Sequence, residues 1–357
     1  MANLIVEVIG GVDTHKELHA AAALDRLGGV LATAEFRTTA RGYIDLLRWL
    51  RSFGHVVAVG VEGTGSWGAG LARFLAVEGV NVVEVNRPDR QLRRRHGKTD
   101  MVDAIAAGRA VLAGTATSTP KSTTGLVECI RLLRIARRSA MKARTQAVNQ
   151  FHSVIDTAPE DLRAELNSVR LVEQLRRAAR FRNTEPVTPR AAAKVALTSI
   201  SRRWADLQEE IVLLDGQLQA LVKQTAPDLV ASHGIGPDTA GALLVAAGDN
   251  PERLHNEAAF AALCGSSPVQ ASSGKTTRHR LNRGGNREAN NALWRIVLVR
   301  MGSEPRTREY VQRRTNDGLS KPEIMRCLKR YVAREVFQTI RSLGLEPPIT
   351  TPQHLTP

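Results

Sequence analysis

Strand-forming stretches are concentrated in the first third of the chain, and this concentration limits the possible folds more than any other feature. Short β-rich apolar runs alternate there with segments of helical periodicity, in the order βββαβαβα. The expected strands are residues 4–12, His19–Asp25, Val30–Phe36, His55–Glu62 and Val80–Val85, and the expected helices lie near Arg41–Ser52, Trp67–Glu78 and Thr99–Leu112. This order predicts a mixed sheet with helices on its faces.

Beyond the Ser/Thr/Pro/Gly-rich boundary at Thr115–Thr124, strand signals fade as far as about Val222. Apolar residues there recur at helical spacing, first Leu126, Ile130, Leu133 and Ala136, and later Trp204, Leu207, Ile211, Leu214, Leu218 and Leu221. Two long amphipathic helices joined through Glu185–Pro189 can form an extended antiparallel arm. The apolar stripe then serves either as an intramolecular core or as a seam for a partner in a coiled coil.

These patterns divide the 357 residues into an α/β part followed by all-α parts. We expect an α/β domain over residues 1–115, a helical arm over 116–226, a mostly helical C-terminal domain over 227–345, and a Pro/Thr-rich tail over 346–357.

The charge of the chain favours a polyanionic partner. The sequence has 50 Lys and Arg against 35 Asp and Glu, a formal net charge of +15. Arginine dominates the basic residues, and its planar fork suits phosphate. Most of the excess lies between Lys275 and Arg341. A GC-rich genome also enriches arginine, so composition alone leaves the partner open.

Several classes of protein are excluded or disfavoured. Cys129, Cys264 and Cys327 lie far apart and form no CxxC pair, which argues against a disulfide framework and a zinc site and fits a reducing cytosol. The N-terminus has no signal-peptide pattern, and no apolar run approaches the ~20 residues of a membrane span. We therefore expect no membrane partner.

Four acidic residues form the first candidate site. Asp13 ends the first strand, Glu62 ends the fourth, and Asp100 and Asp103 are one turn apart on the following helix. Together these carboxylates suit a pair of divalent cations acting on a phosphodiester. Taken singly, each acid has a structural explanation at a strand end or in a first helical turn.

Two further motifs lie in the C-terminal region. The glycine turn of GIGPDTA, with Gly234 and Gly236, leads into a helix whose N-terminus can bind a DNA phosphate, as in a helix-hairpin-helix, or is simply an interhelical turn. Ser272 and Ser273 precede a glycine in what is usually a turn. The basic residues that follow them are Lys275, Arg278, Arg280, Arg283 and Arg287.

Together these segments resemble the DEDD transposases of bacterial insertion sequence family 110. The segments are GVDTHK (Gly11–Lys16), VEGTGSWG (Val61–Gly68), VNRPDRQLRRRHGKTDMVDA (Val85–Ala104), GIGPDTA (Gly234–Ala240) and PVQASSGKTTRHRLNRGGN (Pro268–Asn286). The resemblance implies a ribonuclease H-like domain of the RuvC type at the N-terminus and a bacterial cytoplasmic location. The chain departs from the family around Gly265–Pro268, and at Arg287–Asn290 where a leucine-arginine pair is usual.

The resemblance also implies a mechanism. Asp13, Glu62, Asp100 and Asp103 are expected to hold Mg²⁺, two ions being possible, and Ser273 to attack DNA and form a phosphoserine link. Ser272 is the alternative nucleophile if the register slips by one.

The implied partners are nucleic acids and further copies of the chain. Donor and target DNA are expected to pair with a structured guide RNA, the bridge RNA, whose contacts on this chain are predicted at Arg90, Arg93, Arg94, Arg95 and Lys98. This basic run is otherwise a solvated face. A homodimer that assembles to a tetramer on DNA is expected, with the acids of one protomer meeting the serine of another.

Three other functions compete with this interpretation. A RuvC-like Holliday-junction resolvase or nuclease uses the carboxylates and water, but it needs no residues beyond about 160. An actin-like ATPase or sugar kinase matches the residues around GVDTHK, but it needs a second copy of the fold. An architectural DNA binder leaves the four acids unexplained.

Overall fold

A computed structural model describes residues 6–85, 99–182, 185–272, 279–280 and 282–343. Its contacts group the chain into two compact units. The first unit comprises residues 1–125, 247–260 and 344–357, and the second comprises 126–246 and 261–343. Each unit is described by itself.

The first unit is built on a five-stranded mixed sheet with the order β3-β2-β1-β4-β5. Its strands are β1 (Glu7–Thr14), β2 (Leu18–Leu24), β3 (Val30–Arg37), β4 (His55–Glu62) and β5 (Val82–Val85), and its helices are α1 (Ala40–Arg51), α2 (Ala69–Val77) and α4 (Asp100–Leu112). Strands β1, β4 and β5 run parallel, whereas β2 is antiparallel to both β1 and β3. This architecture fits a ribonuclease H-like domain, so the predicted mixed sheet is confirmed.

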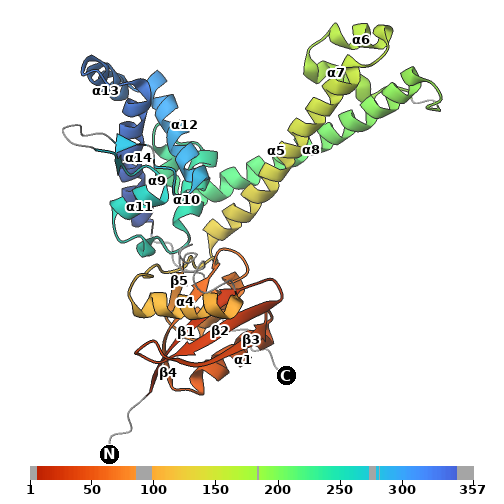
Figure 1. Ribbon diagram of the computed structural model, residues 1–357. Coiled ribbons are helices and arrows are strands. Elements are labelled where there is room, and N and C mark those ends of the chain that lie inside the picture. The colour runs from red at the N-terminus through yellow and green to blue at the C-terminus, as the bar shows by residue number, and fades with distance from the viewer. Residues whose placement is uncertain (1–5, 86–98, 183–184, 273–278, 281, 344–357) are drawn as a thin grey trace, which may run out of the picture. The chain divides into compact units, whose positions relative to one another are not determined.

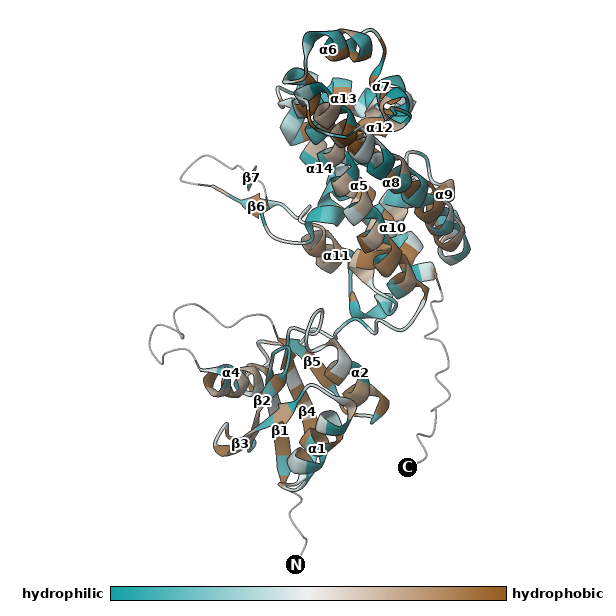
Figure 2. Ribbon diagram, turned by 90° about the vertical axis from the view of Figure 1, so that its right-hand side faces the viewer, coloured by the Kyte–Doolittle hydropathy of each residue, from teal (hydrophilic) through white to brown (hydrophobic). Residues whose placement is uncertain are grey.

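Alternation along the strands gives each face of this sheet its own core. Val8 and Val12 of β1 pack with residues of α1 and α2, such as Leu50. Ile9 packs with Leu24 on the opposite face, where α4 lies. Figure 2 shows hydrophobic colouring along β1 and β4, the strands at the centre of the sheet.

A segment distant in sequence completes the first unit. Residues 247–260, which include the short helix η1 (Pro251–Arg253), contact the residues that follow α4. The Arg253 guanidinium donates to Thr119 O at 2.9 Å and lies 3.5 Å from a Glu84 carboxylate oxygen. No pattern in the sequence predicts this return of the chain.

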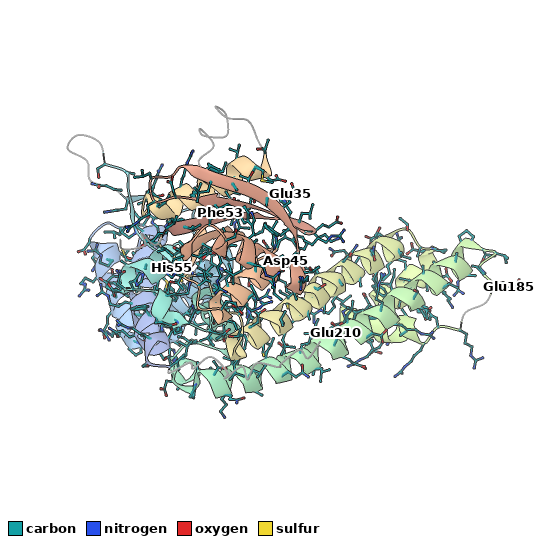
Figure 3. The ribbon with its side chains drawn as sticks, turned by 90° about the horizontal axis from the view of Figure 1, so that it is seen from below. Glu35, Asp45, Phe53, His55, Glu185 and Glu210 are labelled. Atoms are coloured by element: carbon teal, nitrogen blue, oxygen red, sulfur yellow. The ribbon has the colours of Figure 1, made fainter. Side chains whose placement is uncertain are left out.

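The second unit begins with a long antiparallel helix pair. Its helices are α5 (Leu126–Asp156), α6 (Glu160–Asn167), α7 (Leu171–Ala179) and α8 (Pro189–Thr225). Figure 1 shows α5 and α8 side by side, with α6 and α7 at their far end, and Figure 3 shows side chains projecting along both helices. At that far end Phe151, Leu162 and Leu197 share a buried core.

The predicted apolar stripe of α8 is buried at three positions, Ile211, Leu214 and Leu218, and continues at Val222 rather than Leu221. Much of the stripe is therefore packed within the chain.

The rest of the second unit is mostly helical. Its elements are α9 (Pro227–Ala231), α10 (Pro237–Ala247), α12 (Arg287–Ser303), α13 (Pro305–Asn316), α14 (Lys321–Ser342) and the strands β6 (Val269–Gln270) and β7 (His279–Arg280), while α11 (Glu257–Leu263) spans the boundary between the units. The antiparallel β6–β7 pair projects from the helices in Figure 2 and was not predicted. No helix within the described ranges is long and apolar enough to cross a membrane.

Candidate catalytic site

Two glycines allow α4 to lie unusually close to the sheet. A Cβ atom on Gly11 would lie 2.1 Å from Ala104 O and 2.4 Å from Gly108 N. A Cβ atom on Gly60 would lie 2.8 Å from Ala107 O. All three distances are shorter than packing allows, so larger residues would push the helix away. Figure 1 shows α4 crossing β1 and β2.

The same geometry gathers the predicted acids on one face. Asp13 lies two residues after Gly11, and Glu62 lies two residues after Gly60, so each acid shares the α4 face with its glycine. In the parallel β1–β4 pair Val12 is opposite Val61, which places Asp13 and Glu62 on neighbouring strands. Thr14 Oγ1 ties the two strand ends together by donating to Glu62 O at 2.8 Å.

Helix α4 supplies the other two acids in its first turn. Its N-cap, Thr99, accepts a hydrogen bond from Val102 N at 3.3 Å. Asp100 and Asp103 follow the cap, where a negative charge complements the helix dipole. Asp103 is only 3% exposed and Asp13 only 7%, whereas Asp100 is exposed.

A histidine completes the cluster. His15 Nε2 lies 3.2 Å from Asp13 Oδ2 and 3.3 Å from Asp100 Oδ1. Within the described ranges, these three residues each offer one donor atom, and the three atoms lie within 4.8 Å of one another. This set does not include the carboxylates of Glu62 and Asp103. The i, i+2 spacing of Asp13 and His15 at a strand end was the available sequence signal, but our prediction used the acids alone.

The electrostatics of Asp13 reflect this crowding. Burial raises its pKa above the ordinary value, and the nearby charges of Asp103 and Asp100 act in the same direction. His15 opposes the shift through its charge and its hydrogen bond. One carboxylate oxygen of Asp13 and one of Asp100 lie beside the Nε2 atom of His15. Hard divalent cations prefer such oxygen ligands. The residues present therefore fit a divalent cation.

The serine segment lies in the second unit and is only partly described. Ser272 is exposed two residues after β6, and Arg280, Arg283 and Arg287 are also exposed. Asn286 caps α12 by accepting from Glu288 N and Ala289 N, at 2.9 and 3.0 Å. The predicted residues outside the described ranges are Arg90, Arg93, Arg94, Arg95, Lys98, Ser273, Lys275 and Arg278.

The predicted glycine turn is packed against charged residues. Gly234 has a φ of +79°, and the Arg300 guanidinium donates to His233 O at 2.8 Å. At the start of α10, Asp238 contacts Arg134 at 2.7 Å and Arg295 at 2.5 Å. Burial works to raise the pKa of Asp238, but these guanidinium groups outweigh it, so the pKa lies below its ordinary value.

Comparison with known proteins places both units in one family. A DEDD transposase model of the IS110 group matches residues 10–158. A second model, described as transposase of the IS116/IS110/IS902 family, matches residues 228–312. Together they cover about two thirds of the chain and all four acids. The chain belongs to the IS110 family of transposases.

One curated relative of this IS110-family chain is the insertion element IS110 uncharacterized 43.6 kDa protein of Streptomyces coelicolor. The two are 27% identical over 150 residues, which is 41% of this chain and 37% of the relative. The match therefore spans little more than a third of that relative. The region of this IS110-family chain that the second family model matches ends before α14 begins.

Proposed function

We propose that this protein is a site-specific DNA recombinase that cuts and rejoins strands at the ends of an insertion sequence and at its target. The observation that carries the proposal is the convergence of Asp13, Asp100 and Asp103 on one face of a ribonuclease H-like sheet. Family membership supports the same reaction class. The resemblance supplies the remaining components, which are the serine, the guide RNA and the assembly.

Asp13, Glu62, Asp100 and Asp103 would hold Mg²⁺, with His15 beside them. A bound divalent cation neutralises phosphate charge and lowers the pKa of an oxygen nucleophile. Helix α4 packs closely against the sheet at Gly11 and Gly60. This packing fixes the positions of the carboxylates that would hold the cation. His15 contacts Asp13 and Asp100 and so occupies the space between two of the four acids.

Ser273 is the proposed nucleophile. Its Oγ forms a bond to phosphorus, while one bond from phosphorus to a deoxyribose oxygen breaks and that oxygen takes up a proton. The phosphoserine ester keeps the strand end activated, and the reverse reaction with a second strand end rejoins the DNA. Nearby arginines stabilise the charge that develops on the phosphate.

The proposed assembly is a homodimer, and a tetramer on DNA, in which the acids of one protomer act with the serine of another. Apolar side chains on the helix pair support contact with a second copy. Leu132 and Ile135 of α5 are 53% and 44% exposed, and Val212 and Leu213 of α8 are 61% and 62% exposed. A bridge RNA would then pair with donor and target DNA, with Arg90, Arg93, Arg94, Arg95 and Lys98 as its proposed contacts.

The competing functions differ in what they predict. A RuvC-like resolvase uses the same carboxylates with water and forms no covalent link to DNA. An actin-like kinase requires two copies of its fold, and the described residues contain one five-stranded sheet.

A covalent adduct tests the proposal. Labelled duplex DNA carrying the element's end is incubated with the purified full chain, its guide RNA and Mg²⁺, and separated on a denaturing gel. We expect a protein–DNA adduct from the wild type and from the matched variant Ser272→Ala, but none from Ser273→Ala. An undiminished adduct with Ser273→Ala would sink the serine assignment, and cutting without any adduct would favour the resolvase.

A further inference from the structure

The second unit contains a basic cavity that has no role in the mechanism proposed for the acids and the serine. The cavity has a volume of about 610 Å³ and lies between the base of the β6–β7 hairpin and helix α14. One acidic side chain lines it, that of Glu323. Six basic side chains line it, those of Arg280, Arg314, Arg326, Lys329, Arg330 and Arg334. An anionic ligand therefore matches the lining.

The acid in this lining is already committed to the helix. Glu323 accepts from the backbone N and the hydroxyl of Ser320, at 2.9 and 2.6 Å, and so caps the N-terminus of α14. Its nearest contact with Arg326 is 3.9 Å. Glu323 is the one acidic side chain in this lining, against six Lys and Arg side chains, so the lining keeps a net positive charge.

Lys329 is the most informative residue of the lining. It is only 6% exposed, and its ammonium group lies 3.0 Å from Asn290 Oδ1, a neutral acceptor. Among the described residues, no carboxylate lies within 4.0 Å of this ammonium group. Burial lowers the pKa of Lys329, and the charge of Arg326 acts in the same direction. A buried cation without a countercharge is costly, and a bound anion would offset that cost.

Asn290 connects Lys329 to the loop that leads into β6. Its amide nitrogen donates to Cys264 O at 2.8 Å and to Gly265 O at 3.0 Å. Gly265 has a φ of +62°, and a Cβ atom on Gly285 would lie 2.6 Å from Gly265 N. The loop is therefore held tightly from two sides.

The cavity is close to the serine segment along the chain. Arg280 lines the cavity from β7, where it pairs with Val269 of β6. The proposed nucleophile Ser273 follows β6 by three residues in the sequence, which span at most about 10 Å of extended chain. This length equals about three nucleotides of axial rise in a DNA strand.

We propose that this cavity seats a phosphodiester of the DNA strand that is cut, with Arg280 and Arg326 contacting the phosphate and Lys329 acting as a positioning residue for both phosphate and loop. The proposal rests on the proposed recombinase function and deepens it. A DNA strand is favoured over the guide RNA because Arg280 of the lining pairs with β6, and the proposed nucleophile lies between β6 and β7 in the sequence.

The salt dependence of DNA binding tests whether the cavity binds a DNA phosphate. The full chain is titrated into fluorescently labelled duplex DNA carrying the element's end, and affinity is measured by anisotropy at several salt concentrations. Arg280→Gln and Arg326→Gln should each reduce the slope of log affinity against log salt by about 1, because each removes one phosphate contact. Arg308→Gln, an exposed α13 residue outside the cavity, makes the same change in net charge and should leave the slope unaltered.

Ethylation interference locates the contacted phosphate. Wild-type binding should be weakened by ethylation of a phosphate within about three nucleotides of the cut, and Arg280→Gln should lose sensitivity at that phosphate alone. If the cavity variants behave like Arg308→Gln, or lose affinity for guide RNA while DNA binding is unchanged, the proposal is wrong.

Thermal unfolding with and without this DNA tests Lys329. Lys329→Met removes a buried charge, so the variant alone should have an unchanged or higher Tm, while the rise in Tm on adding DNA should shrink. If the variant has a lower Tm but the same rise in Tm on adding DNA, Lys329 only stabilises the fold, and its proposed role at the phosphate is wrong. If Lys329→Met does not fold, Arg280→Gln still tests phosphate binding in the cavity. Arg280 is exposed, so its replacement should not disturb folding.

These outcomes distinguish a failure of the phosphate-binding proposal from a failure of the proposed recombinase function. Reduced slopes without any wild-type adduct would uphold phosphate binding and defeat the serine mechanism. A wild-type adduct, together with salt slopes that the cavity variants leave unaltered, would uphold the serine mechanism and defeat phosphate binding in the cavity.

Discussion

The carboxylate face of the first unit and the serine hairpin of the second unit are built in opposite ways. Asp13 and Asp103 are buried at the ends of regular elements and held by close packing. Ser272, two residues after the two-residue strand β6, and Arg280, on the two-residue strand β7, are both exposed. Carboxylates that repel one another require a rigid frame to stay together, whereas basic groups on a projecting hairpin are drawn to a polyanion without one.

Removing one charge from the carboxylate face should give the largest effect. Asp13→Asn or Asp103→Asn should reduce Mg²⁺-dependent DNA cleavage by about 10³-fold or more, because a metal ligand is worth several kcal/mol of transition-state stabilisation. Cleavage is measured as single-turnover rates on labelled DNA.

The matched control is Asp45→Asn, which removes a half-buried carboxylate from α1, where it pairs with Arg41 and Arg48. It should cleave at the wild-type rate. Full cleavage by Asp13→Asn would show that the carboxylate face is not catalytic and would remove the distinction drawn between the two regions.

Close packing of α4 on the sheet should dominate the stability of the carboxylate face. Gly11→Ala places a methyl group 2.1 Å from Ala104 O and should lower the free energy of unfolding by about 1–3 kcal/mol. Gly65→Ala is the matched control, because nothing lies within 4 Å of the added atom. Denaturant titration of both variants is the measurement. Equal stabilities would mean that α4 moves freely and that the frame is not rigid.

The sequence predicted the carboxylate face better than the serine side, for a physical reason. Strand alternation and helical spacing are local, so they placed Asp13, Glu62, Asp100 and Asp103 at the ends of the correct elements. The Asn290–Lys329 contact joins residues 39 positions apart and leaves no periodic signal. The same holds for the return of residues 247–260 to the first unit.

The ionic contacts of Asp238 should give the smallest effect, and one that depends on pH. Its folded-state pKa lies below the ordinary value, so its stabilisation is complete above about pH 4 and is lost as pH falls through the folded pKa. Asp238→Asn should cost about 1 kcal/mol at pH 7, after allowance for screening of a partly exposed pair. The deficit should shrink below about pH 4.

Urea titration between pH 3 and 7 measures this deficit. Asp206→Asn, an exposed aspartate on α8, should show no such trend. A deficit for Asp238→Asn that stays constant with pH would mean that the carboxylate's charge does not stabilise the start of α10.

The central claim is that the carboxylate face and the serine act on one phosphate from different protomers. The most direct test mixes two inactive variants, Asp13→Asn and Ser273→Ala, exchanges their subunits, and assays the covalent DNA adduct. A mixed dimer then holds one site with intact acids and an intact serine, so we predict that the mixture forms adduct although neither variant does alone. Exchanged mixtures that form no adduct, under conditions where the wild type does, would contradict the claim.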